Sequence, residues 1–321
     1  MVYSNPTTST SQCTINQIIH YVGVGLHSGH SVSMNLYPAA PNTGICFVRK
    51  DVDPEHAVIQ ASWHNVVDTR LCTVLGNDHG VTISTVEHLL AALRSCGVDN
   101  LLIELSGDEV PILDGSCLPL VDMIKKGGVV SQRLPRFGIW IERQIEVRQG
   151  ERYAVLSPSS VPRITVDIDF PNATIGSQCV SVEMIDNVFE KEIAPARTFG
   201  FADELDQLRE QGLALGGSTR NAVLVSDQGV VNEEGLRFSD EFARHKILDC
   251  LGDLALAGAP IFGHLFTHKP GHRLNNALLR ELFAHQDAWS RLSYKEINRR
   301  IEQEEANCAA QKYTVTYLGN G

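Results

Sequence analysis

Two similar sets of strand-like and helical runs, one on each side of a polar segment, constrain the fold of this 321-residue chain most strongly. In the first set, residues 31–37 alternate between apolar and polar side chains, as a half-buried strand does, and residues 99–105 are a second strand candidate. Between them, Ser84-Thr-Val-Glu87 has the form of a helix capping box and precedes the apolar run 89–93. A further helix is predicted over residues 118–126.

The second set begins after residues 131–136, a polar stretch with a proline of the kind that separates domains. Strands are predicted over residues 139–147, 153–156, 163–170 and 261–267, and helices over 240–257, with Ser239 as its cap, and 274–285. Antiparallel-type strands with a pair of helices in each half predict an α+β protein rather than a doubly wound sheet. We therefore expect two domains, residues 1–131 and 137–321, which are compatible with distant structural copies of each other.

Charge and cysteine content narrow the function. Lys and Arg total 27 against 38 Asp and Glu, a net charge of −11, so non-specific binding to nucleic acid is disfavoured and an anionic substrate would need local positive charge. No run approaches the roughly 18 apolar residues of a membrane span, and residues 1–11 are polar, unlike a signal peptide. The 8 cysteines contain no CxxC pair. We expect reduced thiols in a cytoplasmic protein without a transmembrane segment.

The sharpest chemical signal is His245-Lys-Ile-Leu-Asp249 within the predicted helix 240–257. Residues four apart share one helix face, so this imidazole and carboxylate can converge on one point, and Asp253 extends the same face. Such a pair suits a borderline cation such as zinc. An ordinary surface His–Asp pair explains the same spacing, and this fragment alone does not decide between the two.

Glu87-His88 is the second signal, because a helix N-terminus favours negative charge. Locally, however, Glu87 is explained as the acid of the capping box and His88 as a packed core residue. Neither residue is assigned to a site by its immediate neighbours.

His264, His268 and His272 are spaced by four, but glycine and proline at 263, 270 and 271 prevent a common helix, so we reject a shared metal pair of His264 and His268. His272 stands in a predicted loop before a helix, a position that often presents catalytic groups. The glycine pairs near residues 24 and 216 follow neither the dinucleotide nor the P-loop spacing and are interpreted as turns. No serine or cysteine has the surroundings of a nucleophile.

Seven segments, taken together and in order, resemble one family, the UDP-3-O-acyl-N-acetylglucosamine deacetylases of lipid A biosynthesis. They are Gly23-Val-Gly-Leu-His-Ser-Gly29, Ser84-Thr-Val-Glu-His-Leu89, Val110-Pro-Ile-Leu-Asp-Gly-Ser116, Ala196-Arg-Thr-Phe-Gly-Phe201, Gly235-Leu-Arg-Phe238, His245-Lys-Ile-Leu-Asp249 and Gly271-His-Arg-Leu-Asn-Asn276. Each is weak alone, whereas the ordered set is specific. The chain from about residue 287 onward carries no recognised motif.

The resemblance implies a zinc hydrolase that removes the N-acetyl group from a UDP-linked acylated glucosamine. One zinc per chain would be bound by His88, His245 and Asp249 with a fourth position open, and ferrous iron suits the same ligands. The resemblance further implies that Glu87 is the general base and that Thr198 stabilises the oxyanion. His272, oriented by Asp253, would protonate the leaving amine. Lys246 and Lys269 would bind the anionic part of the substrate.

The resemblance also implies an insert at about residues 199–224 that holds the acyl chain, with candidate contacts at Phe199, Leu213, Ala214, Gly217 and Ser218. These residues could equally pack a small βαβ unit. The implied fold is two similar domains, each a layered sandwich of β-sheets and paired helices, with the site between them. We expect a monomer. The alternatives are a metal-dependent amidohydrolase for another acylated sugar nucleotide and a non-catalytic binder of acylated nucleotide sugars.

Overall fold

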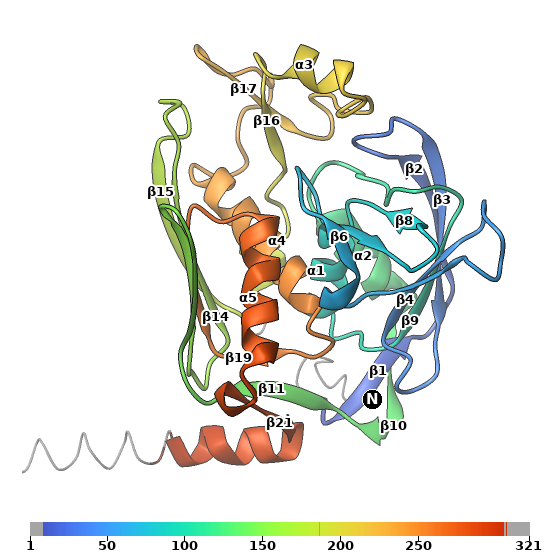
Figure 1. Cartoon of the computed structure of the whole chain (residues 1–321), viewed down its shortest axis with the longest axis vertical. Helices are drawn as coiled ribbons and strands as arrows, with labels where there is room; N and C mark the ends of the chain where they lie inside the picture. The colour runs from blue at the N-terminus through green and yellow to red at the C-terminus, as the bar shows by residue number, and fades with distance from the viewer. Residues whose placement is uncertain (1–8, 186, 305, 307–321) are drawn as a thin grey trace, which may run out of the picture.

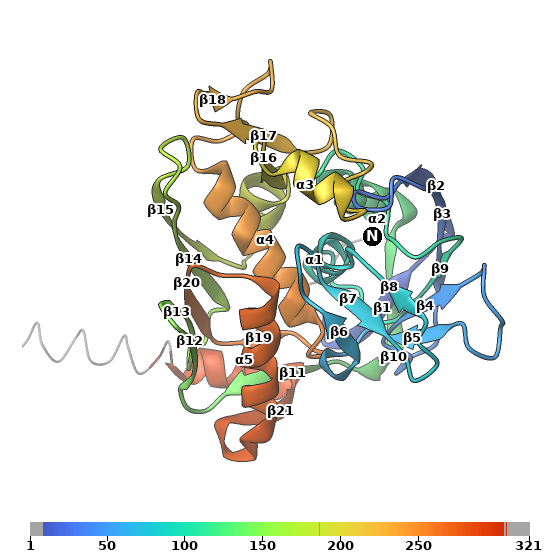
Figure 2. The same cartoon turned by 45° about the horizontal axis from the view of Figure 1, so that its top comes forward.

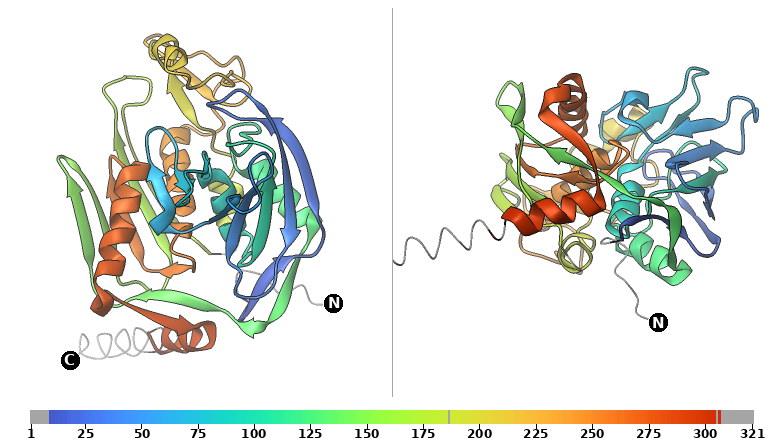
Figure 3. Two further views of the ribbon diagram at one scale, coloured as in Figure 1. Left: turned by 45° about the vertical axis from the view of Figure 1, so that its right-hand side comes forward. Right: turned by 90° about the horizontal axis from the view of Figure 1, so that it is seen from below.

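Two five-stranded sheets form the outer layers of the protein, and helices from both halves fill the space between them (Figure 1). The structure is a computed structural model that describes residues 9–185, 187–304 and 306. The left panel of Figure 3 shows the layers from another side, with the N-terminal sheet in blue and green opposite the C-terminal sheet. This arrangement of sheets and helices confirms the predicted α+β class.

The first sheet has the order β2-β3-β9-β4-β5. Its strands are β2 (Ile19–Val24), β3 (Ser31–Pro38), β9 (Leu101–Leu105), β4 (Ile45–Arg49) and β5 (Val58–Gln60). In β3 every second residue is buried, as the sequence pattern predicts, because one face of the strand packs on the core. The helices of this half are α1 (Glu87–Ser95) and α2 (Leu118–Gly127).

The second sheet, β12-β13-β20-β14-β15, repeats the topology of the first. Its strands are β12 (Ile145–Gln149), β13 (Arg152–Ser157), β20 (His264–His268), β14 (Arg163–Asp169) and β15 (Ser177–Glu183). In both sheets successive neighbours pair antiparallel, antiparallel, parallel and antiparallel. Helices α4 (Glu241–Ala255) and α5 (His272–Ala284) stand on either side of β20 in the chain, as α1 and α2 do around β9. The halves are therefore structural copies.

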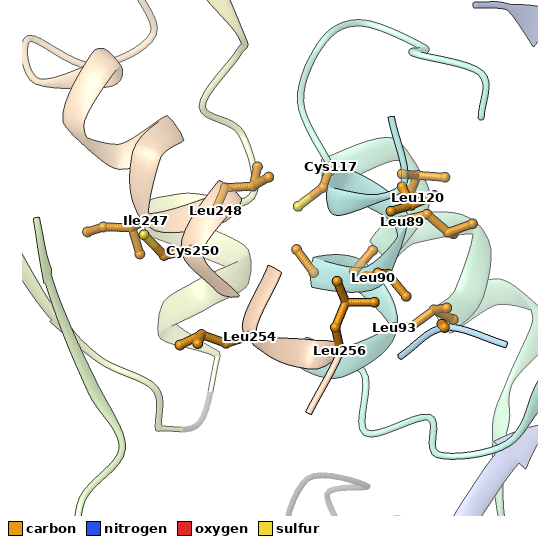
Figure 4. Packing of buried hydrophobic residues seen from close by; sticks show 14 of the residues in the cluster. Leu89, Leu90, Leu93, Cys117, Leu120, Ile247, Leu248, Cys250, Leu254 and Leu256 are labelled. Carbon is orange, nitrogen blue, oxygen red and sulfur yellow. The ribbon is translucent and has the colours of Figure 1, made fainter. Parts of the chain in front are cut away.

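The core is continuous across the halves because α1 packs directly against α4. Figure 4 shows leucines of α1 and α2 beside apolar side chains of α4. The labelled residues are Leu89, Leu90, Leu93, Cys117 and Leu120 on one side and Ile247, Leu248, Cys250, Leu254 and Leu256 on the other. Burial of this apolar surface stabilises the contact between the halves.

Two predicted strands are each broken in two. Residues 139–147 divide into β11 (Phe137–Ile141) and β12, and residues 261–267 divide into β19 (Ile261–Phe262) and β20. Strands β11 and β19 form a separate sheet with β21 (Trp289–Ser293). At the second break, a Cβ on Gly263 would lie 2.7 Å from Cγ1 of Ile141, so the chain can change sheets there only at a residue without a side chain.

The polar segment at residues 131–136 is mostly strand. It belongs to β10 (Val129–Pro135), which pairs with β1 (Ser11–Ile15) of the first half. The division of the chain into domains at residues 131 and 137 stays a prediction. Residues 1–8 of the first predicted domain and 307–321 of the second lie outside the described residues.

The predicted insert forms a small βαβ unit beside the two main layers (Figure 2). Strand β16 (Phe199–Phe201) pairs in parallel with β17 (Val223–Ser226), α3 (Leu205–Glu210) connects them, and β18 (Gly229–Val230) pairs with β17. The remaining elements are β6 (Val66–Asp68), β7 (Val74–Gly76), β8 (Thr82–Ile83), the short helical turns Trp63–Asn65, Phe189–Ile193 and Gln286–Ala288, and a helix over residues 294–304. Among the described helices, none has the length and apolar character that crossing a bilayer requires.

The start of α4 differs from the prediction. Its N-cap is Asp240, and no side chain caps the helix, so the predicted cap at Ser239 is wrong. Glu241, in the first turn, is instead buried and accepts hydrogen bonds from the backbone N and Nε of Arg197 at 3.0 and 2.9 Å. This ion pair ties the segment before β16 to the helix.

Candidate metal centre and active site

Two imidazoles and one carboxylate meet where α1 packs on α4. His88 is the second residue of α1, and His245 and Asp249 lie one turn apart on α4. One ligand atom from each lies within 4.8 Å of the others. Asp249 Oδ1 is 3.3 Å from His245 Nε2 and 3.8 Å from His88 Nε2, and the two rings are 5.0 Å apart at 74°. All three residues are at most 5% exposed.

Gly252 allows the two helices to approach this closely. A Cβ at this position would lie 2.0 Å from the backbone oxygen of Glu87, far inside van der Waals contact. A glycine inside a helix costs about 1 kcal/mol relative to alanine, so a packing reason is expected for it. Gly252 is not among the residues predicted from the sequence, although a glycine three residues after Asp249 inside a helix was an available signal.

The surroundings of the cluster orient its donor atoms. Nδ1 of His245 lies 3.1 Å from the carbonyl oxygen of Ala196, which leaves Nε2 for the cluster. Lys246 donates to the other carboxylate oxygen of Asp249 at 2.7 Å. Nδ1 of His88 is buried and has no hydrogen-bond partner among the described residues.

The surroundings of the three residues shift their pKa values toward the protonation states that bind a metal. Burial, together with the nearby His245, lowers the pKa of His88 to about 3, and burial lowers the pKa of His245 as well. Burial alone would raise the pKa of Asp249, but His245 and Lys246 outweigh it and lower that pKa. Neutral imidazoles and an ionised carboxylate are the states that bind a metal. The three residues therefore fit a divalent cation in a site with three protein ligands.

The carboxylate of Glu87 does not take part in a capping box, so the predicted capping box is wrong. The N-cap of α1 is Val86 without a side-chain cap, and the hydroxyl of Ser84 donates instead to the carbonyl of Asp108 at 2.9 Å. Oε2 of Glu87 accepts from the backbone N of Thr73 at 3.1 Å. Burial raises the pKa of Glu87 to about 7, although the nearby His272 opposes the shift. A buried carboxyl group with this pKa suits proton transfer at neutral pH.

His272 faces Glu87 across the site. It is the first residue of α5 rather than part of a loop, and its Nε2 lies 3.9 Å from Oε1 of Glu87. Its Nδ1 is 2.9 Å from Oδ2 of Asp253. Burial alone would lower the pKa of His272, but the carboxylates of Asp253 and Glu87 outweigh it and raise the pKa to about 9. The imidazole is therefore a cation at neutral pH.

Asp253 is itself held by two residues that the sequence argument did not single out. Its Oδ1 accepts from Oγ1 of Thr73 at 2.5 Å, and its Oδ2 accepts from Nδ2 of Asn275 at 2.8 Å. Asn275 lies one turn after His272, inside a segment that carried the resemblance, so its spacing was a usable signal. No sequence signal indicated Thr73, because its contact with Asp253 joins residues that are far apart in the chain.

The remaining predicted residues have simpler surroundings. Thr198 uses its backbone N to donate to Gly115 at 2.8 Å and lies two residues after Ala196, the partner of His245. Lys269 forms ion pairs with Asp169 at 3.2 Å and Glu151 at 3.4 Å. The other two histidines of the regularly spaced set bind neighbours of their own sheet, His264 to Thr165 and His268 to Asp167, each at 2.8 Å.

The insert contacts the first half near the site. Phe199 lies with its ring 6.4 Å from that of His245, and Gly216 donates from its backbone N to the carbonyl of Leu26 at 3.0 Å. A Cβ on Gly216 would lie 2.1 Å from the backbone oxygen of Gly25, so these two glycines mark a close approach of two backbones. The predicted turn is present at Gly216, where the backbone N of Gly217 donates to the carbonyl of Ala214 at 3.1 Å, whereas Gly23 belongs to β2. Among the other candidates, Ala214 is buried, Leu213 and Gly217 are half-buried and Ser218 is exposed.

His27, in the same first-half segment, was quoted within a motif but given no role. Both ring nitrogens are buried, and neither has a hydrogen-bond partner among the described residues. Its backbone N and that of Ser28 donate to the carboxylate of Glu109, each at 2.8 Å. Burial lowers the pKa of His27.

Comparison with known proteins matches residues 12–284 to the model of the family described as UDP-3-O-acyl N-acetylglycosamine deacetylase. The chain belongs to this family. Curated relatives named UDP-3-O-acyl-N-acetylglucosamine deacetylase include those of Tolumonas auensis (45% identical) and Acidithiobacillus ferrooxidans (46%), each match covering 89% of this chain and 94% of the relative. The relative from Shewanella oneidensis is 44% identical over 88% of this chain and 93% of its own length. Membership of the deacetylase family confirms the resemblance drawn from the seven segments.

Proposed function

We propose that the protein is a zinc-dependent hydrolase that removes the N-acetyl group of UDP-3-O-acyl-N-acetylglucosamine during lipid A biosynthesis and releases acetate. The observation that carries the proposal is the convergence of His88, His245 and Asp249 beside the facing pair Glu87 and His272. The names of the relatives supply the substrate.

The three-donor set supports zinc as the metal, and ferrous iron fits the same nitrogen and oxygen ligands. A bound zinc ion would polarise the acetyl carbonyl and lower the pKa of water. The interaction between Lys246 and Asp249 keeps one carboxylate oxygen occupied, so that Oδ1 is the oxygen directed to the two histidines.

Glu87 acts as the general base. It is adjacent to the ligand His88 in the chain, and one of its carboxylate oxygens is held by the backbone of Thr73 while the other faces His272. Glu87 takes a proton from the water that attacks the acetyl carbon. The side chain of Thr198, which makes no hydrogen bond within the described part of the chain, stabilises the negative oxygen that develops on that carbon.

His272 acts on the leaving group. Asp253 binds Nδ1, so the proton on Nε2 points toward Glu87 and the reacting amide. When the carbon–nitrogen bond breaks, Nε2 gives its proton to the amine of the sugar, and acetate leaves with the oxygen from water. Thr73 and Asn275 keep Asp253 in place and so fix the direction of the imidazole.

Substrate binding extends from this centre to the insert. Phe199, Leu213, Ala214, Gly217 and Ser218 are proposed to contact the acyl chain, and Lys246 and Lys269 the anionic part of the substrate. Two domains meeting at the site, a monomeric state and a cytoplasmic location remain our proposals. The location is supported by the free state of all seven cysteines that the structure describes, while Cys308 lies outside the described residues.

An acetate-release assay on the UDP-linked substrate tests the function. We expect activity to disappear with a chelator and to return with zinc. The variant His245→Ala should lose both metal and activity, whereas Glu87→Gln should keep one zinc per chain and lose activity by about 10²- to 10⁴-fold. Arg280→Ala, on the exposed face of α5, serves as the control. Undiminished turnover by Glu87→Gln would remove Glu87 from the mechanism, and full turnover of zinc-free protein would refute the metal site.

A further inference from the structure

A buried carboxylate outside the proposed metal centre, that of Glu109, holds the loop of residues 25–30 that connects β2 to β3. Glu109 is 0% exposed. Its Oε1 accepts a hydrogen bond from the backbone N of His27, and its Oε2 accepts one from the backbone N of Ser28, each at 2.8 Å. Two successive N–H groups that point at one carboxylate form an anion-binding nest, so the Glu109 side chain fixes the path of this loop.

The loop also passes close to this side chain. A Cβ on Gly25 would lie 2.2 Å from Oε2 of Glu109 and 2.4 Å from Oγ of Ser28. Any larger residue at position 25 would therefore push the loop and the carboxylate apart. Because burying a charged group without partners is costly, the loop and Glu109 stabilise each other's positions in the folded protein.

The third donor to Glu109 comes from the turn before α1. Oγ1 of Thr85 donates to Oε1 of Glu109 at 2.9 Å, and Thr85 stands two residues before Glu87. Thr85 has a φ of 58°, a conformation that a residue other than glycine keeps only when its surroundings hold it there. The same carboxylate thus joins the loop of residues 25–30 to the start of α1.

The loop in turn holds the insert. Residues 215–216 of the insert donate from their backbone N atoms to the carbonyls of His27 and Leu26, at 3.1 and 3.0 Å. A Cβ on Gly217 would lie 3.7 Å from Cδ1 of Leu26 and 3.7 Å from Cβ of Ala214. The half-buried side chain of Leu26 therefore lies beside two of the residues that are proposed to contact the acyl chain.

We infer that Glu109 is a positioning residue that sets the preference of the enzyme for a long acyl chain, because it fixes the loop against which the insert packs. The inference rests on the proposed deacetylation. Glu109 is fully buried, so it acts through Leu26 and the insert rather than by touching the substrate. If the loop moves, a long chain loses apolar contacts along the insert, whereas a short chain has few such contacts to lose.

Acetate release from two UDP-linked substrates, one with a 3-O-myristoyl group and one with a 3-O-butanoyl group, tests the inference. In Glu109→Gln an amide nitrogen replaces one acceptor oxygen, so at least one N–H group that points at Glu109 loses its partner. We expect KM for the myristoyl substrate to rise and kcat/KM to fall by at least about tenfold, whereas kcat/KM for the butanoyl substrate should fall by less than about threefold. The variant should still bind one zinc per chain.

A second variant and a control separate this role from a loss of stability. Gly25→Ala disturbs the same contact from the side of the loop, should show the same loss on the myristoyl substrate, and covers the case in which Glu109→Gln does not fold. Asp99→Asn is the matched control, because the Asp99 carboxylate also accepts from a backbone N, that of Cys13 at 2.8 Å, but makes no contact with the loop or the insert. Its ratio of kcat/KM between the two substrates should equal that of the wild type. An equal fall on both substrates, or an unchanged ratio, in the two test variants would overturn the inference.

Hydrogen exchange of the full-length zinc protein, followed by mass spectrometry, tests Glu109 without turnover. The amides of residues 215–216, which donate to the loop, should exchange at least about tenfold faster in Glu109→Gln than in the wild type. Unchanged exchange in this segment would overturn the inference. Wild-type protein that releases acetate from neither substrate would instead refute the proposed function.

Discussion

Replacing Gly252 by alanine should separate the two helices that carry the proposed metal donors. The added Cβ would stand 2.0 Å from the backbone oxygen of Glu87, whereas real Cβ contacts essentially never fall below 3.0 Å. A displacement of at least about 1 Å is therefore required. Because the obstructing atom belongs to the backbone of α1, the helix itself has to move, and it carries Glu87 and His88.

The expected effects follow from that displacement. Metal–ligand distances tolerate deviations of only about 0.2 Å, so we expect zinc affinity to fall by about 10- to 100-fold. Alanine gains about 1 kcal/mol in helix propensity, but overpacking of about 1–3 kcal/mol opposes it. Gly252→Ala should thus lower the free energy of unfolding of the zinc-free protein by up to about 2 kcal/mol, the reverse of the usual effect of this substitution inside a helix.

Zinc affinity is measured by competition with a chromophoric chelator, and the free energy of unfolding by urea denaturation of the zinc-free protein. Gly127→Ala, in α2, is the matched control: its Cβ would meet the flexible end of Ile19 at 2.8 Å, far along the chain from any ligand. Zinc affinity should be unchanged in that variant. Wild-type zinc affinity combined with a more stable zinc-free protein in Gly252→Ala would refute the reasoning.

Three further predictions concern buried charges. With the pKa of His272 raised to about 9, its cation persists through neutral pH, so turnover should fall as the pH rises through about 9; His272→Gln should remove that limb of the pH–rate profile. Asp253→Asn removes a charge that raises this pKa, and the limb should move to lower pH, whereas an unmoved limb would assign it to another group. Arg197→Met leaves Glu241 buried without its cation and should cost about 3–5 kcal/mol in urea denaturation, more than the double replacement of Arg197 and Glu241 by Met and Gln.

Much of the fold was predictable because its periodicities are local. Strand β3 and helices α2, α4 and α5 begin and end within a few residues of their predicted bounds. The errors occur where tertiary contacts override a local pattern. Ser84 lies in a β-bridge with Glu109, and Thr85 has a φ of 58°, so the chain that resembled a capping box is instead a strained turn before α1.

The candidate site was predictable to the extent that its residues share an element. Helical spacing places His245 and Asp249 on one face without deciding that they bind a metal, whereas His88 was added to them only through the family resemblance, because nothing local relates α1 to α4. The carbonyl of Ala196 and the hydroxyl of Thr73 contact the site through the tertiary fold alone. A carbonyl carries no side-chain identity, so no sequence pattern predicts that it orients a ligand.

The repeated topology explains why the donors are divided between the halves. Helices α1 and α4 occupy equivalent places in the two copies, each shortly before the strand that enters the middle of its sheet. Their contact at Gly252 brings one proposed donor from the first half to two from the second, so neither half holds the complete proposed site. Metal binding is then linked to association of the halves: a cation bound only by the packed pair stabilises that packing, by about 4.1 kcal/mol at a free concentration 1,000 times its Kd. Substitutions that loosen α1 from α4 must weaken metal binding, whereas equally destabilising substitutions in the outer sheets need not.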